Sequence, residues 1–197
     1  IDINELQKKI TKKTKVILPV HMLGVPVDMK KINFIAKKYK LKVLEDNCEA
    51  TGAKYDGKYC GTIGDVGVLS LDFGKIITTG EGGIIFSQKR SIDKFCREYH
   101  DHGHENNPKF QRGNDTKSII GFNYRMTELQ AAIGKVQLKK LNFIIKENKK
   151  RYDLLLKSLS KRFEIREIPP NSSPINDTFI FFVRNENEKN RVIKCLA

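Results

Sequence analysis

Two charged side chains stand where ligands bind in α/β proteins. Asp46 directly follows the strand-like run 42–45, and Lys75 comes four residues after the apolar run 66–71. In open α/β sheets, ligands bind beyond the carboxyl ends of the strands. An amine and a carboxylate that meet there suit an aldehyde cofactor, because the lysine forms a Schiff base and the acid keeps a pyridine nitrogen protonated. Taken alone, Asp46 could instead be a helix N-cap and Lys75 a surface lysine.

Two glycine patterns close to these residues do not indicate a nucleotide site. The glycines at 61, 64 and 67 imitate a dinucleotide fingerprint, but they precede a strand and do not open a helix. Gly74 and Lys75 imitate the end of a P-loop, but Ile76 stands where serine or threonine is required. The chemistry of Lys75 is therefore better sought in its amine than in phosphate binding by a P-loop.

The hydrophobic pattern predicts an α/β fold. Four apolar runs indicate buried strands, at 16–20, 42–45, 66–71 and 83–87. Asp28 is a good N-cap for a helix over 29–39, between the first two strands. A strand, a helix and a strand in that order favour a parallel sheet with crossover helices. We expect 51–65 to be irregular and 92–99 to form a short helix.

A long helix and a short tail complete the predicted organisation. Apolar residues recur at helical spacing from 127 to 158, and Thr127 resembles an N-cap. Three further elements are expected in the tail, namely strands at 163–168 and 178–183 and a helix at 190–197. The composition changes near Lys157, which predicts a domain boundary between 1–157 and 158–197.

The composition is that of a globular protein. Hydrophobic residues make up 39% and charged residues 30% of the 197 residues, which excludes a disordered chain. No apolar run approaches the roughly 20 residues that cross a bilayer. The first residues lack the apolar core of a signal peptide. The four cysteines have no C-x-x-C spacing, so we interpret them as reduced thiols of a cytoplasmic protein.

The positive charge raises nucleic acid as a partner but does not favour it. The chain has 37 Lys+Arg against 23 Asp+Glu, a formal net charge of +14. The lysines are scattered along the chain and many fall on predicted helix faces, which favours a solvated surface over a nucleic-acid groove. A basic field could equally serve an anionic small substrate.

Residues 100–121 form a polar loop that is long for a compact domain, and such loops are usually functional or mobile. His100, His102 and His104 alternate in this loop, which invites a zinc interpretation. Alternation in a loop is not a recognised ligand spacing. We therefore expect no metal and interpret the three histidines as part of a basic loop at the active site.

Four motifs follow one another along the chain: PVHMLG at 19–24, LEDNCEATGA at 44–53, FGKIITTGEGG at 73–83 and GFNYRMTELQ at 121–130. In this order they resemble the DegT/DnrJ/StrS family of sugar aminotransferases, which use pyridoxal 5′-phosphate on the fold-type-I scaffold. The resemblance covers nearly all of the chain. It implies an α-β-α sandwich with a mostly parallel sheet, in which 1–157 belong to the cofactor-binding large domain and 158–197 begin a small α+β domain.

The resemblance implies roles for four residues around the cofactor. Lys75 matches the lysine that holds the cofactor as a Schiff base and later moves protons. Asp46 matches the partner of the pyridine nitrogen. Glu49 stands beside the ring, where the family often has glutamine, and Ser70 matches a hydroxyl that binds the cofactor phosphate. By type alone, Ser70 could be an ordinary strand residue.

Three further residues complete the implied site. Asn123 matches a side chain that reaches the phosphate in the neighbouring subunit, which implies a homodimer with shared active sites. Arg125 lies close by and could neutralise phosphate or substrate charge. We also expect His21 to face the cleft from the end of its strand. By type alone, Asn123 could be a turn residue.

The resemblance implies a keto-sugar aminotransferase. An amino acid, glutamate by family analogy, loads the cofactor, and a keto sugar that is usually nucleotide-linked receives the amine for polysaccharide or amino-sugar synthesis. Two alternatives stay open. A sugar 3-dehydrase of the same fold is favoured by the 47–49 run but opposed by Lys75, since those relatives carry histidine there. A catalytically inactive fragment or partner subunit is the other.

Family members are roughly twice as long as this chain. We therefore expect the chain to be truncated at both ends and to lack half of the cup that holds the cofactor phosphate. This expectation predicts that the isolated chain binds pyridoxal 5′-phosphate weakly, if at all.

Overall fold

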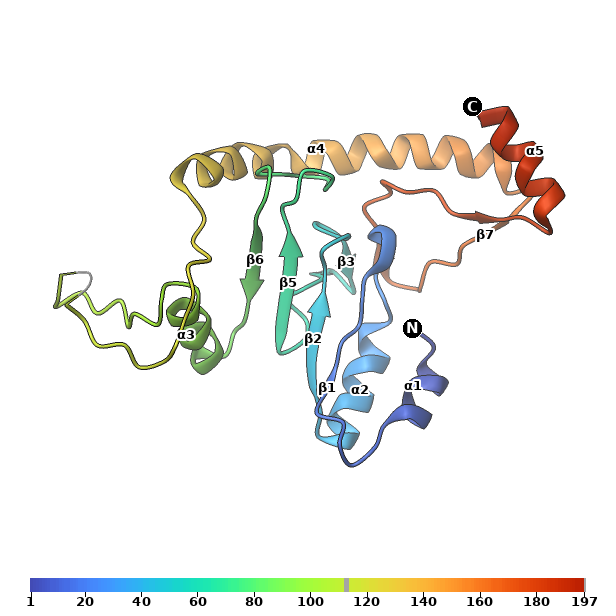
Figure 1. Ribbon diagram of the computed structural model, residues 1–197. Helices are drawn as coiled ribbons and strands as arrows, with labels where there is room; N and C mark the ends of the chain where they lie inside the picture. Colours follow the sequence, from blue (N-terminus) through green and yellow to red (C-terminus); the bar gives the residue numbers. More distant parts are fainter. Residues whose placement is uncertain (112–113, 197) are drawn as a thin grey trace.

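A mixed four-stranded sheet forms the centre of the molecule (Figure 1). The structure is a computed structural model that describes residues 1–111 and 114–196. The sheet order is β1 (Val16–Ile17), β2 (Lys42–Asp46), β5 (Val66–Ser70) and β6 (Gly83–Phe86). The first three strands are parallel, and β6 runs antiparallel to β5. The predicted α/β fold with a mostly parallel sheet is confirmed.

The first strand is shorter than the predicted run 16–20. It ends at Ile17, and only an isolated bridge between Val20 and Asp46 continues the pairing. Pro19 has no N–H to donate to a ladder, although its carbonyl accepts from Asp46 N at 2.9 Å. A second backbone bond, from His21 N to Asp46 O, also holds this segment beside the end of β2.

Helix α2 (Met29–Tyr39) covers the sheet with one apolar face, as predicted. Asp28 caps it by accepting from Lys31 N at 3.1 Å. Its buried side chains include Met29, Ile32 and Ile35, which form the main core together with residues of β1 and β2. A short helix that the sequence did not predict, α1 (Ile3–Lys9), lies beside α2.

The segment 51–65, expected to be irregular, contains a β-hairpin. Strands β3 (Lys54–Tyr55) and β4 (Lys58–Tyr59) are joined by Asp56 and Gly57, both with positive φ. Asp-Gly between two strand-forming pairs is a strong hairpin signal, so the expectation was wrong on evidence already in the sequence. Strand β8 (Ser172–Ser173) pairs with β3 from the far end of the chain.

Helix α4 (Glu128–Leu159) runs across the carboxyl ends of the strands, at the top of Figure 1. Its start confirms Thr127 as the N-cap, because Thr127 and Gln130 form a reciprocal capping box. Leu141 and Ile144 pack against Leu69 and Leu71 at the end of β5. Between α3 (Arg90–Tyr99) and α4, the described part of residues 100–127 has no helix or named strand and projects beyond β6.

Part of the tail packs against the main core through Ile175. Strands β7 (Glu164–Ile165) and β9 (Phe181–Phe182) are shorter than predicted, and α5 (Glu186–Leu196) begins four residues early because Asn185 accepts from Glu188 N. Ile175 is 1% exposed and belongs to the main core. Nothing in this packing divides 158–197 cleanly from the preceding residues, and the boundary at Lys157 stays a prediction. Within the described residues, no helix combines the length and hydrophobicity that a membrane span requires.

Candidate active site

Asp46 is fixed at the carboxyl end of β2 by its backbone. Asp46 N donates to Pro19 O at 2.9 Å, and His21 N donates to Asp46 O at 3.0 Å. The next residues leave the strand, and Cys48 N donates to Asp46 Oδ1 at 3.0 Å. The half-buried carboxylate therefore has a defined position, and Asp46 ends a strand rather than capping a helix.

Lys75 is presented by a tight loop after β5. Ser70 Oγ accepts from Asp72 N at 3.2 Å, and Asp72 Oδ1 accepts from Gly74 N at 3.1 Å. Lys75 N donates to Asp72 O at 3.1 Å. Aspartate side chains commonly build such turns. Ser70, the predicted phosphate ligand, thus shapes the loop that carries Lys75.

The Lys75 side chain lines a cavity of about 170 Å³. The cavity lies where the loops after β1, β2 and β5 meet residues of the tail, and its lining residues are Leu23, Cys48, Glu49, Gly74, Lys75, Ile76, Asp177 and Thr178. Lys75 is half-buried, and its amine has no hydrogen bond or ion pair with any residue described in the structure. A half-buried amine without a partner is available to a ligand.

The Cys48 thiol is influenced by both the Lys75 amine and the Asp46 carboxylate. Burial and a hydrogen bond to the Asp46 carboxylate raise the pKa of the Cys48 thiol to about 11. The Asp46 charge raises this pKa further, whereas the Lys75 charge lowers it. The geometry agrees, because Cys48 lines the cavity with Lys75 and its N–H donates to Asp46, so Lys75 and Asp46 lie at the same edge of the sheet.

Two carboxylates line the cavity with Lys75. Glu49 Oε2 accepts from Leu23 N at 2.9 Å, which ties the loop after β1 to the segment after β2. Burial raises the pKa of Asp177, and the charge of Glu49 raises it further. The sequence did not predict Asp177 or Thr178, because only the docking of Ile175 in the core brings this part of the tail to the cavity.

His21 lies beneath the site and does not face the cleft. Its side chain is 0% exposed, is absent from the cavity lining, and bonds to the equally buried Glu45. The expectation that His21 meets substrate or phosphate is therefore replaced by a buried contact. Sequence reasoning missed this because the ring is held by contacts outside its own turn, with Val27 N donating to His21 Nδ1 and Glu45 bonding to Nε2.

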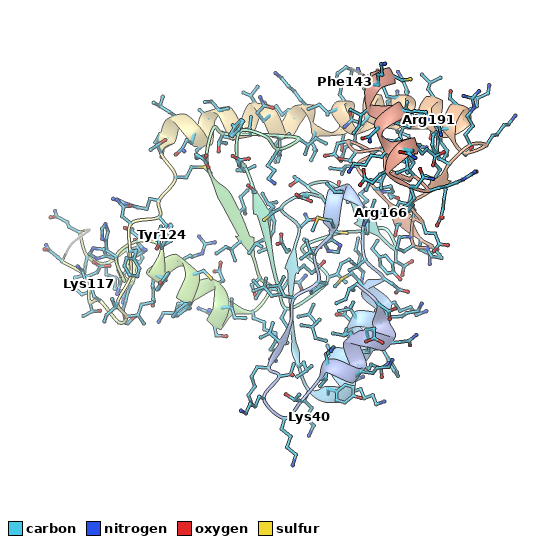
Figure 2. The ribbon with its side chains drawn as sticks, turned by 45° about the vertical axis from the view of Figure 1, so that its right-hand side comes forward. Lys40, Lys117, Tyr124, Phe143, Arg166 and Arg191 are labelled. Atoms are coloured by element: carbon cyan, nitrogen blue, oxygen red, sulfur yellow. The ribbon has the colours of Figure 1, made fainter. Side chains whose placement is uncertain are left out.

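Asn123 and Arg125 lie on the projecting segment beyond β6, away from the Lys75 cavity. Both are exposed and neither lines that cavity. Arg125 Nε donates to Asn123 Oδ1 at 3.1 Å and lies 3.4 Å from Asp101 Oδ1. Figure 2 shows Tyr124, which stands between them in sequence, on this segment. Within one chain, the structure therefore does not bring the predicted phosphate ligands Asn123 and Ser70 together.

The histidine loop is held by a hydrogen bond between His104 and Asp115. His104 Nδ1 lies 2.7 Å from Asp115 Oδ1, and both side chains are almost fully buried. His100 Nδ1 lies 2.6 Å from Arg97 O. Among the residues that the structure describes, no three His, Cys, Asp or Glu side chains are grouped to hold a metal ion.

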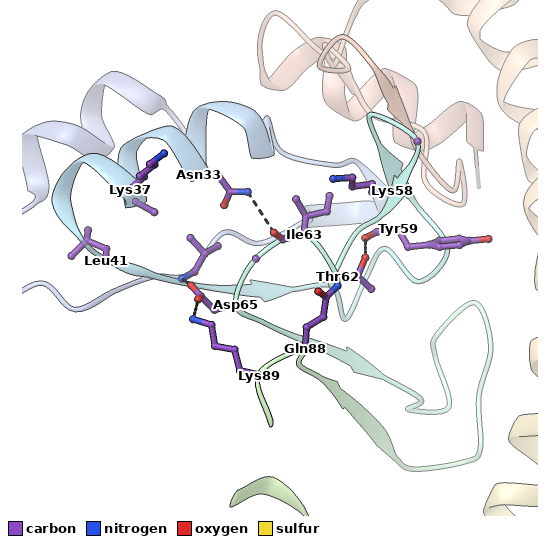
Figure 3. Close-up of a pocket in the computed structure, with 14 residues that line it drawn as sticks. Asn33, Lys37, Leu41, Lys58, Tyr59, Thr62, Ile63, Asp65, Gln88 and Lys89 are labelled. Atoms are coloured by element: carbon purple, nitrogen blue, oxygen red, sulfur yellow. Dashed lines mark hydrogen bonds and ion pairs between the residues drawn. The ribbon is translucent and has the colours of Figure 1, made fainter. Parts of the chain in front are cut away.

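A second and larger hollow lies elsewhere (Figure 3). It has a volume of about 860 Å³ and is bordered by Leu41, Val43 and Asp65, at the amino ends of β2 and β5. Its carboxylate, Asp65, is already paired with Lys89. Because β2 and β5 are parallel, this hollow and the Lys75 cavity open at opposite edges of the sheet.

Comparison with known proteins defines first the fold and then the family. The solved structure of E. coli GDP-4-keto-6-deoxy-D-mannose-3-dehydratase with bound hydrated PLP matches with a TM-score of 0.85 and 30% identity, over 100% of this chain and 54% of that one. The fold is that of the fold-type-I aminotransferases. A model of the DegT/DnrJ/EryC1/StrS aminotransferase family matches residues 1–197, and the chain belongs to this family.

Curated relatives agree with this assignment. GDP-perosamine synthase of Escherichia coli O157:H7 is 35% identical over 85% of this chain and 44% of its own length. The 3-oxo-glucose-6-phosphate:glutamate aminotransferase of Bacillus subtilis is 36% identical over 84% of this chain and 35% of its own length. The chain thus spans less than half the length of these relatives.

Proposed function

We propose that this chain carries the cofactor-holding residues of a pyridoxal-phosphate-dependent sugar aminotransferase. One observation carries the proposal. The free amine of Lys75 and the carboxylate of Asp46 both act on Cys48, beside a cavity at the carboxyl ends of parallel strands. Family membership and a PLP-bearing structural relative support the same conclusion.

The residues present fit the cofactor. Lys75 supplies a half-buried amine for its aldehyde carbon, and Asp46 supplies a fixed carboxylate for its ring nitrogen. The pair would hold the two ends of one pyridine ring. When bound, pyridoxal 5′-phosphate withdraws electrons from the carbon that carries the transferred amine, which is chemistry that no side chain supplies.

The chain's own residues would then orient reactants and move protons. Lys75 Nζ would be the base and acid at the cavity, since no other described residue forms a hydrogen bond or ion pair with it. The Asp46 carboxylate would face the ring nitrogen, and the hydrogen bond from Cys48 N keeps one of its oxygens in place. Leu23 and Ile76 give the cavity part of its apolar lining. Glu49 and Asp177 offer oxygens that can accept from sugar hydroxyls.

Substrate classes follow from the relatives and from charge. One relative is named a glutamate aminotransferase and another a GDP-perosamine synthase, so we assign glutamate as donor and a nucleotide-linked keto sugar as acceptor. The net charge of +14 suits an anionic diphosphate. The reaction would serve polysaccharide synthesis in the cytoplasm.

We further assign Asn123 and Arg125 to the site of a second copy, in a homodimer with shared active sites. Both lie on the projecting segment rather than at the Lys75 cavity. Large apolar side chains stay exposed on the same segment: Ile120 at 88%, Phe122 at 50% and Tyr124 at 66%. Exposed apolar patches of this kind mark interaction sites.

Covalent capture tests the proposal. The chain is mixed with a large excess of pyridoxal 5′-phosphate, so that weak binding is also captured, then reduced with borohydride, digested and analysed by mass spectrometry. We expect one pyridoxyl group on Lys75, lost in Lys75→Ala and kept in Lys135→Ala, whose side chain is exposed on α4. Equal modification of many lysines, or none, contradicts the proposal.

The 3-dehydrase is the second candidate, because a structural relative carries that name. Lys75 opposes it, since the resemblance gives those enzymes histidine at this position. Product analysis separates the two reactions. A sugar product that gains nitrogen identifies amine transfer, and a product that loses its 3-hydroxyl identifies the dehydrase.

A further inference from the structure

A buried hydrogen-bonded pair adjoins the candidate site. His21 and Glu45 are each 0% exposed, and His21 Nε2 lies 3.0 Å from Glu45 Oε2. Neither residue lines the Lys75 cavity, and the function proposed above uses neither. Polar and charged side chains are rarely buried to this extent unless their hydrogen bonds are made, so the contacts of the pair indicate its role.

The hydrogen bonds of His21 assign its tautomer. Val27 N donates to His21 Nδ1 at 3.1 Å, so Nδ1 is an acceptor and carries no proton. Nε2 must then carry the proton, which it donates to Glu45. The ring is held at both nitrogens and cannot rotate without losing a buried bond.

Glu45 accepts hydrogen bonds from the backbone of a different segment, the turn 61–64. Gly61 N donates to Oε2 at 2.8 Å, Ile63 N donates to Oε1 at 2.6 Å, and Gly64 N donates to Oε1 as well. Burial alone would raise the pKa of Glu45, but the bonds from His21 and these three N–H groups outweigh burial and lower it. The carboxylate is thus an anion with four donors.

The pair connects the segments that form the cavity. His21 precedes Leu23, which lines the cavity, and Glu45 precedes Asp46. His21 N also donates to Asp46 O at 3.0 Å. Successive strand residues face opposite sides of a sheet, so the buried Glu45 and the half-buried Asp46 lie on opposite faces. Glu45 therefore acts on the site only through its neighbours.

We propose that His21 and Glu45 are positioning residues of the candidate site, which lock the loop after β1, the end of β2 and the turn 61–64 together so that Asp46, Cys48 and Leu23 keep their places around Lys75. The role in cofactor binding rests on the proposed function. The locking itself does not, and can be measured without cofactor.

Cys48 is a native reporter of this locking. It stands two residues after Asp46, lines the cavity and is half-buried. The chain is pulsed with a maleimide at pH 8, and labelling of Cys48 is followed by peptide mass spectrometry. His21→Ala is expected to raise the labelling rate about tenfold, and His21→Gln, which keeps an N–H donor for Glu45, to restore most of the protection.

A matched control separates positioning from loss of stability. Ile35→Ala opens a cavity in the core beneath α2, at a side chain that bonds to neither His21 nor Glu45, and destabilises the fold without removing any of these bonds. At equal folded fraction its Cys48 rate should stay within about twofold of the unmodified chain. If Ile35→Ala and His21→Ala raise the rate equally, or if His21→Ala does not raise it, the proposal is overturned. If His21→Ala does not fold, His21→Gln and Glu45→Gln decide by the same criterion.

A second measurement separates this proposal from the proposed function. The dissociation constant for pyridoxal 5′-phosphate is measured on the same variants. Faster Cys48 labelling in a chain that binds no cofactor supports the locking and contradicts the proposed function. Unchanged labelling in a chain that captures cofactor on Lys75 supports the proposed function and overturns the locking.

Discussion

At the residue scale, the Cys48 thiol reports the electrostatics of the candidate site. Its pKa is raised to about 11 by burial first and by Asp46 second. At pH 8 the thiol is therefore almost wholly protonated and reacts slowly, because the thiolate is the nucleophile. A slow thiol beside Lys75 would not compete with the amine for an aldehyde.

Asp46→Asn should increase the reactivity of Cys48. The substitution removes the charge that raises the thiol pKa, so the pKa falls and the thiolate fraction at pH 8 rises. We expect labelling several-fold faster, with the exposed Cys195 in the same chain as internal control. An unchanged ratio of the two rates would show that Asp46 does not act on Cys48.

Glu45 should make stability depend on acidity. Its folded-state pKa lies below the ordinary value of 4.5, since its hydrogen bonds outweigh the cost of burial. A depressed carboxyl pKa stabilises the fold fully above pH 4.5, and the contribution is lost as the pH falls through the folded pKa. Urea unfolding between pH 3 and pH 7 measures this. The decline toward pH 3 should be smaller in Glu45→Gln than in the unmodified chain.

At the element scale, hydrogen bonds at the start of α4 join this helix to Glu81, in the segment between Lys75 and β6. Thr127 Oγ1 accepts from Gln130 N, and Gln130 Nε2 donates to Glu81 O at 2.8 Å. Thr127→Ala should lower the free energy of unfolding by about 1 kcal/mol, the usual cost of a lost N-cap. Ser158→Ala near the other end of α4 is the control, and we expect about 0.5 kcal/mol or less there. Equal losses would show that the cap is not formed.

The contact between β5 and the turn 61–64 leaves no room for a side chain. A Cβ on Gly67 would lie 1.8 Å from the Gly61 carbonyl oxygen. Gly67→Ala must therefore displace the turn that binds Glu45, at a cost of about 4 kcal/mol or more. Gly57→Ala meets no atom within 4 Å and pays only for its positive φ, about 1 kcal/mol. Thermal unfolding of both variants checks the contrast.

At the scale of the whole molecule, a shared active site makes a quantitative prediction. Lys75→Ala and Asn123→Ala chains are each expected to bind cofactor poorly. In a mixed dimer, one site combines the intact Lys75 of one copy with the intact Asn123 of the other. After random exchange at equal amounts, about a quarter of all sites should recover binding. No recovery in chains shown by sedimentation to have exchanged contradicts the sharing.

Much of this molecule follows from local sequence. Asp28 and Thr127 predicted the starts of α2 and α4, because a side chain that accepts from the first helical turn acts within three residues. The strand β2 and the position of Asp46 at its end were equally predictable from the apolar run. The hairpin at Asp56-Gly57 is also encoded locally, although we expected this segment to be irregular.

The sequence by itself determined the elements, their order and the identity of Lys75 and Asp46 as candidate ligands. Only the tertiary structure decided that His21 turns inward to Glu45, that Asp177 reaches the Lys75 cavity and that Asn123 lies outside it. The reason is physical. Local patterns encode hydrogen bonds between near neighbours, whereas these three placements depend on bonds and packing between segments that lie more than twenty residues apart.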